Sequence, residues 1–215
     1  MQIENAHQAV RSCSQHKGYG SNPMTKLGDI QFKIAVSPVD LQMVARLRHK
    51  IFVAQDRAMP AKPNGLLDDR FDRSPLTTNL MALCKGELVG CVRLTAASAE
   101  GTATDLIYDF LPYLPEKRHL AISAGMLCMK KRFRGKSGLT SGLIKAALSY
   151  SHQHAYTHVY ATMNPKVEPM MSAFGFEVVS PLFVDDTTGL SMLPMVLNIE
   201  RTKLRQPGWP YRLSR

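Results

Sequence analysis

The spacing of hydrophobic and polar residues changes several times along the first part of the chain, and each change predicts an element. Residues 30–36 alternate apolar and polar side chains, which predicts a half-buried strand. Ser37 and Pro38 then form a helix-start signal, and apolar residues follow at helical spacing as far as Phe52. Two prolines and an Asn-Gly pair within residues 59–66 predict a loop.

The clearest pattern in the middle of the chain is that of a β-hairpin. Residues 80–96 form two apolar runs that are separated by a turn at residues 85–87. A short apolar element follows at residues 107–114. Residues 120–129 predict another strand, and residues 139–155 predict a helix with its leucines and alanines on one face.

The last part of the chain predicts a strand at residues 157–164, a short helix at residues 169–174 and two closing strands. This order of elements is typical of an α+β protein in which helices cover a sheet. The polar, aperiodic residues 1–27 predict a flexible arm, residues 28–200 a single folded domain, and residues 201–215 a basic tail.

Composition indicates a globular enzyme of the cytoplasm. Hydrophobic residues make up 45% of the chain and charged residues 20%, which is ordinary for a soluble domain. No apolar run reaches the roughly 18 residues that span a bilayer, and the first residues lack the features of a secretory signal. The cysteines have no C-x-x-C spacing and the histidines form no metal motif, so we predict no disulfide framework and no metal.

The chain carries a formal net charge of +10, and the excess is unevenly distributed. Residues 130–136 contain five Lys and Arg, and five more follow Glu200 without an acidic neighbour. Such clusters fit nucleic acid, an anionic membrane surface or an acidic protein. Because no known nucleic-acid-binding motif is present in the sequence, specific nucleic-acid binding is not predicted, while peripheral association with an anionic membrane stays open.

The segment RFRGKSG, residues 132–138, joins the predicted strand at 120–129 to the predicted helix at 139–155. A strand that turns through glycine into a helix presents backbone N–H groups and the positive end of the helix dipole to an anion. Arg132, Arg134 and Lys136 add positive charge around this turn. The segment therefore predicts a phosphate-binding loop, and a solvated basic turn is the alternative interpretation.

Two segments, RFRGKSGLTSGLIKAAL and THVYATMNPKVEPMMSAFGFEVV, resemble the GNAT superfamily of acyltransferases. The superfamily motif, Arg or Gln, two residues, Gly, one residue, then Gly or Ala, is matched by Arg132 and Gly135, with Ser137 in the last position and Gly138 displaced by one. The resemblance implies a GNAT-like α/β/α layered domain with a mixed, mostly antiparallel central sheet. It also implies a binding site for an acyl-phosphopantetheine donor, either acyl carrier protein or acyl-CoA, made by Leu127, Cys128, Met129, Arg132, Arg134, Gly135, Lys136, Ser137, Gly138 and Asn164.

Residues nearer the N-terminus resemble particular families within this superfamily. RLRHKIF places Arg48 and Phe52 on a helix, LLDDRFDRSP supplies Asp69 and Asp72, and GCVRLT places Arg93 on the hairpin. This combination resembles the acyl-homoserine-lactone synthases and, more closely, the bacterial long-chain N-acyl amino acid synthases. It implies that these five residues bind the amine acceptor, since the carboxylate of an amino acid suits Arg and its ammonium suits Asp. A structural cluster of salt bridges is the alternative interpretation.

The catalytic groups of these families are matched only in part. Their strand before the loop carries Glu and, three residues later, Arg, where this chain has Ser123 and Met126. The Tyr that many GNAT enzymes offer to the leaving thiol is replaced by Met171. Asp69, Asp72 and Ser123 are the candidates for catalysis, and a water relayed by backbone carbonyls, or a loss of activity, are the alternatives. Backbone N–H groups of residues 127–129 could stabilise the oxyanion.

The resemblance implies an N-acyltransferase that moves a long-chain fatty acyl group from a thioester to an amino acid or similar small-molecule amine. The basic surface favours an acidic acyl carrier protein as the partner, because complementary charge raises the rate of encounter. A short-chain CoA-dependent N-acetyltransferase and a catalytically degenerate GNAT-fold binding protein are the alternatives. The sequence predicts no particular oligomeric state.

Overall fold

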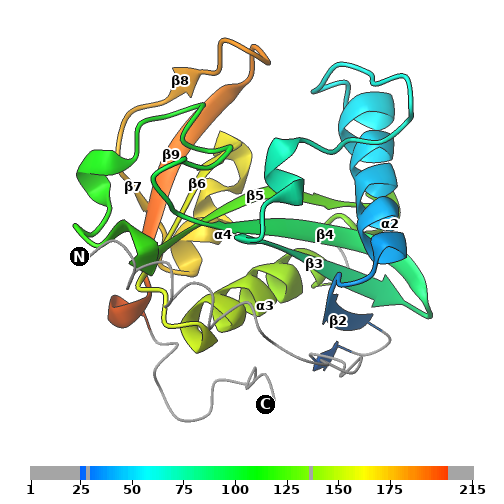
Figure 1. The fold of residues 1–215 in the computed structure, drawn as a ribbon, viewed down its shortest axis with the longest axis horizontal. Helices are drawn as coiled ribbons and strands as arrows, with labels where there is room; N and C mark the ends of the chain where they lie inside the picture. The colour runs from blue at the N-terminus through cyan, green and yellow to red at the C-terminus, as the bar shows by residue number, and fades with distance from the viewer. Residues whose placement is uncertain (1–24, 28–29, 136–137, 203–215) are drawn as a thin grey trace, which may run out of the picture.

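The computed structural model describes residues 25–27, 30–135 and 138–202, and these form one mixed sheet with helices on both faces (Figure 1). The sheet order is β1-β2-β3-β4-β5-β6-β9-β7, and β8 also pairs with β9. All pairs are antiparallel except β5 with β6. The strands are β1 (Thr25–Leu27), β2 (Ile30–Ile34), β3 (Thr77–Cys84), β4 (Glu87–Ala96), β5 (Ala121–Met129), β6 (His158–Met163), β7 (Glu177–Val178), β8 (Phe183–Val184) and β9 (Ser191–Asn198).

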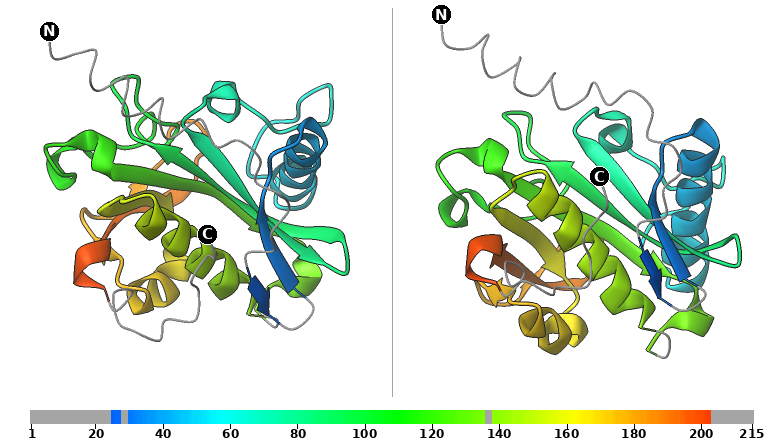
Figure 2. Two further views of the ribbon diagram at one scale, coloured as in Figure 1. Left: turned by 60° about the horizontal axis from the view of Figure 1, so that its bottom comes forward. Right: turned by 90° about the horizontal axis from the view of Figure 1, so that it is seen from below.

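Helices pack on both faces of the sheet (Figure 2). Helix α2 (Pro38–Arg48) and the π-helix η1 (His49–Gln55) pack on one face, against Met81, Cys91 and Cys128. Helices α3 (Leu139–Gln153) and α4 (Glu168–Ala173) pack on the other. Short 3-10 turns complete the chain: η2 (Arg70–Arg73), η3 (Leu111–Tyr113), η4 (Arg118–Leu120), η5 (Lys131–Phe133), η6 (Pro165–Val167) and η7 (Ile199–Arg201).

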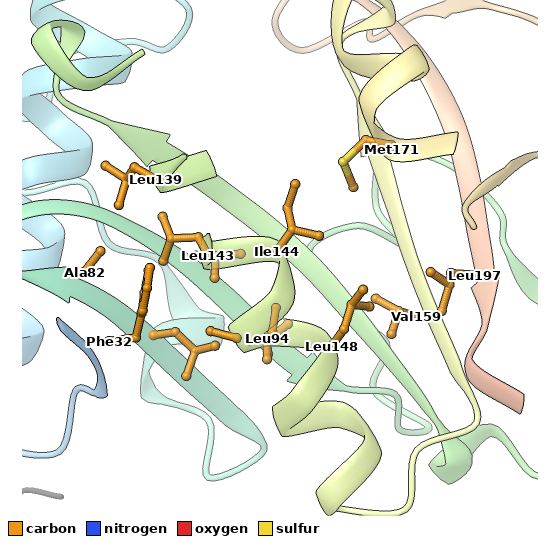
Figure 3. Packing of buried hydrophobic residues seen from close by; sticks show 14 of the residues in the cluster. Phe32, Ala82, Leu94, Leu139, Leu143, Ile144, Leu148, Val159, Met171 and Leu197 are labelled. Atoms are coloured by element: carbon orange, nitrogen blue, oxygen red, sulfur yellow. The ribbon is translucent and has the colours of Figure 1, made fainter. Parts of the chain in front are cut away.

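The main core lies between the sheet and α3 (Figure 3). Leu143, Ile144 and Leu148 of α3 pack on Leu94 of β4 and Phe32 of β2. The helix can approach this closely because it carries glycine where it crosses β2: a Cβ on Gly142 would lie 2.4 Å from the Phe32 ring. The predicted one-sided helix is therefore confirmed, and its position fixes where the preceding loop leaves the sheet.

Two local features of β5 position the candidate site. The register with β4 shifts between Cys91 and Arg93, and Met126 at the shift has a left-handed φ of 53°. This is a β-bulge, which bends a strand and re-aims its side chains. On its other edge β5 pairs with β6 at three positions only, from Ala121 to Ser123, and the two strands then separate. The rest of β5 is thus not paired with β6.

The sequence predictions for the elements are confirmed in outline. The hairpin, α3, β6 and the closing strand β9 lie where their patterns indicate, and Ser37 caps α2 in a capping box with Asp40. The π-helix η1, the strand β8 and the bulge were not predicted, and the apolar element at 107–114 contains only a 3-10 turn. In the expected arm, residues 25–27 form β1, whereas residues 1–24 lie outside the described residues, as do 203–215 of the tail.

Within the described ranges, no helix combines the length and the hydropathy that crossing a membrane requires. The mixed, mostly antiparallel sheet with helices on both faces matches the layered α+β architecture that the sequence analysis expected.

Candidate active site

A buried charge network joins α2, the acidic loop and the hairpin on the α2 face of the sheet. It consists of Arg48, Asp69, Asp72, Asn79 and Arg93. Arg48 Nη1 donates to Asp72 Oδ1 at 2.7 Å, and its Nη2 donates to the Asn79 side chain. Arg93 Nη1 donates to both Asp69 oxygens at 2.8 Å and to Asp72 Oδ2 at 3.1 Å. Asp72 therefore bridges the two guanidinium groups.

Local structure explains why these side chains meet. Asp69 caps the turn η2, accepting hydrogen bonds from the backbone N–H groups of Phe71 and Asp72, while Asp72 returns a bond to the Asp69 backbone. This reciprocal cap leaves both carboxylates on the side of the turn that faces the sheet. Asn79 and Arg93 are cross-strand partners in the β3–β4 register, so they share that face. The sequence prediction grouped the four charged residues correctly and did not include Asn79, which directly precedes the predicted hairpin at residues 80–96.

Burial and neighbouring charges act in opposite directions on the pKa values of Asp72 and Arg48. Burial alone would raise the pKa of the Asp72 carboxyl, but the charges of Arg48 and Arg93 together hold it below its usual value. Burial alone would lower the pKa of Arg48, and the nearby Cys91 and Asp72 raise it overall. Both shifts favour the charged forms of Asp72 and Arg48. Because Asp72 is both ion-paired and low in pKa, it is a poor proton acceptor.

A cavity and the Phe52 side chain lie on the same face of the sheet as the network. A cavity of about 260 Å³ lies beside the network, and its wall is made by Leu41, Gln42, Val44, Ala45, Arg48, Leu66, Asp68, Asp72, Arg73 and Asn79. Phe52, which was predicted to bind the acceptor, is half-buried and packs against the cluster that contains Ile51, Cys91 and Cys128.

The bulged strand β5 lies next to this network. Gly125 is the register partner of Arg93, and Thr104 lies over it, 3.9 Å from where a Cβ would be. Ser123, a predicted catalytic candidate, is buried and its hydroxyl is 2.5 Å from that of Thr104. Neither Gly125 nor Thr104 was predicted as a site residue from the sequence. An isolated glycine within a strand pattern is a recognised signal for a bulge, and Gly125 could have been found in that way.

The basic loop begins where β5 ends. Gly135 and Gly138 both adopt left-handed backbone conformations, with φ of 73° and 64°. Gly138 is the N-cap of α3 and has no side chain with which to cap it. The helix start is therefore not capped by its own N-cap residue, as a phosphate-binding turn requires. Lys136 and Ser137, which belong to the predicted set, lie outside the described residues.

Each arginine of this loop, and Lys130 before it, is paired with a carboxylate from another element. Arg134 makes a two-pronged ion pair with Asp56, with N–O distances of 3.0 and 2.7 Å. Lys130 and Arg132 both bind Glu87, at the start of β4. The hydrogen bond from Lys130 lowers the pKa of Glu87, and the bond to Asp56 raises the pKa of Arg134. These pairs are exposed to solvent, so an external anion can compete for the cations.

The remaining residues that were predicted to bind the acyl donor lie on β5 and after β6, the two strands that separate. Leu127 and Met129 face the α3 core, Cys128 faces α2, and Asn164 follows β6 and caps η6 by accepting a bond from the Lys166 N–H at 2.9 Å. Met171, which stands where a proton donor was expected, is buried in the core. In the described part of the chain, no group of three or more His, Cys, Asp or Glu residues could hold a metal ion.

The arrangement brings a partly unpaired strand edge, a basic helix start and a buried ionic network into one region. A family model described as N-acyl amino acid synthase FeeM matches residues 43–198. Comparison with curated protein sequences gives no match.

Several solved structures share the fold. FeeM, an N-acyl amino acid synthase from uncultured soil microbes, superposes with a TM-score of 0.66 at 17% identity, covering 80% of this chain and 92% of that one. The CoA-dependent acyl-homoserine lactone synthase BjaI, solved with SAM and isopentyl-CoA, gives 0.62 at 21% identity, covering 79% and 82%. A putative N-acetyltransferase from Lactobacillus plantarum gives 0.60 at 17% identity, covering 80% and 99%.

Proposed function

The chain belongs to the FeeM family of N-acyl amino acid synthases, and on this premise we propose that it transfers a long-chain fatty acyl group to the amine of an amino acid. It is an acyltransferase by family, and the donor is a phosphopantetheine thioester carried by acyl carrier protein or coenzyme A. The observation that carries the proposal is the separation of β5 from β6 after three paired residues, directly before the basic loop.

The separated strand suits the donor arm. Phosphopantetheine contains two amide groups, which can pair with a free strand edge as another strand would. Its phosphate then lies toward Gly138 and the start of α3, where N–H groups and the basic side chains of Arg132 and Arg134 are available. The thioester lies further along β5, near the bulge at Met126. Backbone N–H groups of residues 127–129 are the nearest candidates for stabilising its oxyanion.

The acceptor amine has to reach that thioester. Neighbouring strands lie about 4.8 Å apart, so Arg93 on β4 is about 5 Å from Gly125 on β5, and Asn79 on β3 is about 10 Å from it. We therefore place the acceptor amino acid over Arg93 and Asp69 and not in the more distant cavity beside Asn79. The Asp69 side chain is 34% exposed, against 12% for Asp72, so Asp69 is the carboxylate that an ammonium group can approach.

The reaction needs little further assistance. The acceptor ammonium loses one proton to water, and the neutral amine attacks the thioester carbon. The C–S bond then breaks, the thiolate leaves without an acid because it is a good leaving group, and the second proton of the nitrogen passes to water. Ser123 is neutral and hydrogen-bonded to Thr104, and Asp72 is held in its ionised form by two guanidinium groups. Asp69 is thus the side chain that we assign to orient the ammonium, and water takes up its proton.

A direct assay tests the proposal. The purified protein is incubated with palmitoyl-acyl carrier protein or palmitoyl-CoA and a pool of amino acids, and N-acyl amino acids are measured by mass spectrometry. Product with either donor supports the proposal, and the faster donor identifies the carrier. Acetyl transfer without a preference for long chains supports the short-chain alternative. If coenzyme A binds and no acyl product forms with any chain length, the chain is a binding protein of this fold.

Two substitutions distinguish the strand edge from the cavity as the place where the acceptor binds. A Cβ at Gly125 meets only ordinary contact with Thr104, so we expect Gly125→Ala to fold and Gly125→Val to add the bulk that blocks transfer at the strand edge. Leu41→Trp fills the cavity on α2. Our placement predicts that Gly125→Val abolishes turnover and that Leu41→Trp leaves the acceptor KM unchanged. A raised acceptor KM in Leu41→Trp alone moves the acceptor into the cavity.

A further inference from the structure

Two cysteines face each other across the strands that carry the candidate site. Cys91 of β4 and Cys128 of β5 are direct register partners, and their Sγ atoms are 3.5 Å apart. Both side chains point to the α2 face and are buried. The third described cysteine, Cys84, is partly buried on β3 and has Glu87 and Ile30 as its partners, so it has no cysteine opposite it.

The backbone geometry allows a bond between the two sulfur atoms. Directly opposed residues on antiparallel strands have Cα atoms about 4.5 to 5.5 Å apart, and disulfides form at Cα separations of about 4.4 to 6.8 Å. The sulfur atoms need to close from 3.5 Å to about 2.05 Å. Rotation of the two side chains achieves this with the strands in place.

The surroundings make the two thiols unequal. The hydrogen bond with Cys128 lowers the pKa of Cys91, and the nearby Arg48 guanidinium lowers it further, although burial acts in the opposite direction. The same pairing raises the pKa of Cys128. Arg48 Nε is buried and has no hydrogen-bond partner among the described residues, so an anionic sulfur in its vicinity would be stabilised. Cys91 is therefore the sulfur that ionises first, and the thiolate is the reactive form.

We propose that Cys91 and Cys128 form an oxidisable dithiol that a hydroperoxide converts into an intramolecular disulfide. The Cys91 thiolate attacks the outer peroxide oxygen, which breaks the O–O bond, releases the alcohol or water and leaves a sulfenic acid on Cys91. The Cys128 thiol then attacks the Cys91 sulfur and expels water. In total, two thiols and one hydroperoxide give one disulfide, one alcohol and one water, and the peroxide is the species reduced.

The site lies beside the bulge that shapes the donor strand. Cys91 and Cys128 are the last register pair on one side of the shift, and Arg93 with Gly125 is the first pair on the other. A disulfide here fixes β4 to β5 at the point where β5 leaves its regular path. Access for the oxidant comes from local opening of the α2 layer, which admits a small neutral peroxide more readily than a charged reagent. The chemistry does not depend on acyl transfer.

The experiment follows the native, full-length protein treated with hydrogen peroxide. Intact mass spectrometry is expected to show the loss of two hydrogen atoms, restored by dithiothreitol, and peptide mapping is expected to link the Cys91 and Cys128 peptides. A bond that involves Cys84 or Cys13 overturns the proposal. So does a native protein that keeps its free thiols under conditions in which the guanidine-unfolded protein is oxidised.

Substitutions provide matched controls. Cys91→Ala and Cys128→Ala each remove one partner and are expected to abolish the reversible mass loss, whereas Cys84→Ser retains it. A mass loss that persists in Cys128→Ala identifies a different partner and contradicts the assignment. If a core variant fails to fold, the wild-type protein is treated with or without peroxide, then unfolded in guanidine without a reductant and alkylated. Only Cys91 and Cys128 should lose reactivity together.

Discussion

The two charged regions of the candidate site differ in how their charges are used. In the buried charge network the Arg48 and Arg93 side chains are 1% and 4% exposed, and their partners are other residues of the network. In the basic loop the Arg132 and Arg134 side chains are 62% and 41% exposed, and each is paired with a single carboxylate in solvent. A buried ion pair is strongly coupled to the fold, and an exposed one is worth little to it.

This difference assigns different roles to residue types that look alike in sequence. The buried network holds the acidic loop against the hairpin and presents Asp69 at its open edge. The basic loop keeps its cations near solvent, where an anion can displace Glu87 and Asp56. Substitutions in the first region should act mainly on stability and on the acceptor, and substitutions in the second mainly on the donor.

The largest effect is expected from Asp72→Asn. Asp72 accepts from both buried guanidinium groups, so its loss leaves the buried Arg48 without its carboxylate partner and Arg93 with Asp69 alone. Breaking a buried pair in this way costs about 3 to 5 kcal/mol in the free energy of unfolding. Urea unfolding measured by circular dichroism checks this. Asp68→Asn is the matched control in the same loop, since Asp68 is more exposed, and a change there equal to that of Asp72→Asn would contradict the comparison.

The same residue predicts a pH dependence. The folded-state pKa of Asp72 lies below its ordinary value, so its contribution to stability is fully present above the unfolded pKa of about 3.9 and is lost as the pH falls through the folded pKa. Wild-type stability should therefore fall more steeply with acid than that of Asp72→Asn, by up to about 1.4 kcal/mol per pH unit. Equal slopes below about pH 4 would show that Asp72 is not held in its ionised form.

The next effect is expected from Arg93→Ala in the acyl-transfer assay. Arg93 lies between Asp69 and the strand edge at Gly125, so removing its charge should lower kcat/KM for the acceptor by roughly 10- to 100-fold. The donor KM should change much less. Arg93→Lys keeps the charge and loses the forked geometry, and it should recover part of the acceptor kcat/KM. A larger change for the donor than for the acceptor would reverse our assignment of the two regions.

The elements of the fold differ in how clearly the sequence indicates them. The hairpin and α3 follow directly from period and turn residues, because both are set by local pattern. The π-helix after Arg48 was not predicted because its apolar spacing differs little from that of an α-helix over seven residues. The bulge at Met126 was not predicted either, since methionine does not normally mark a left-handed φ and the local signal for the bulge is the neighbouring Gly125.

The site shows the same division. Four charged residues of the network were grouped correctly by their resemblance to known enzymes, and the structure brings all four together. Two features could not be predicted: that the charged groups are hydrogen-bonded to one another, and that Asn79 takes part. Both depend on how deeply α2 and η2 bury the residues between them.

A smaller effect is expected from Arg134→Ala. Its partner Asp56 is on the surface, so the free energy of unfolding should change by less than about 1 kcal/mol. Donor binding should weaken by about tenfold, because a charge-assisted contact to phosphate is lost, and the dependence of the donor KM on salt should become shallower. Arg73→Ala, at an 84% exposed arginine on the acceptor side, is the matched control and should leave the donor KM unchanged.

The smallest and most discriminating effect is expected from Glu87→Gln. Glu87 binds Lys130 and Arg132, so in the absence of donor it occupies the cations that an incoming phosphate needs. Neutralising it should lower the donor KM by about two- to threefold, because the donor no longer competes with an internal carboxylate. The acceptor KM and the urea midpoint should stay as in the wild type. If the donor KM rises instead, Glu87 positions the two cations for the donor. The exposed ion pairs would then organise the donor site as the buried pairs organise the acceptor site.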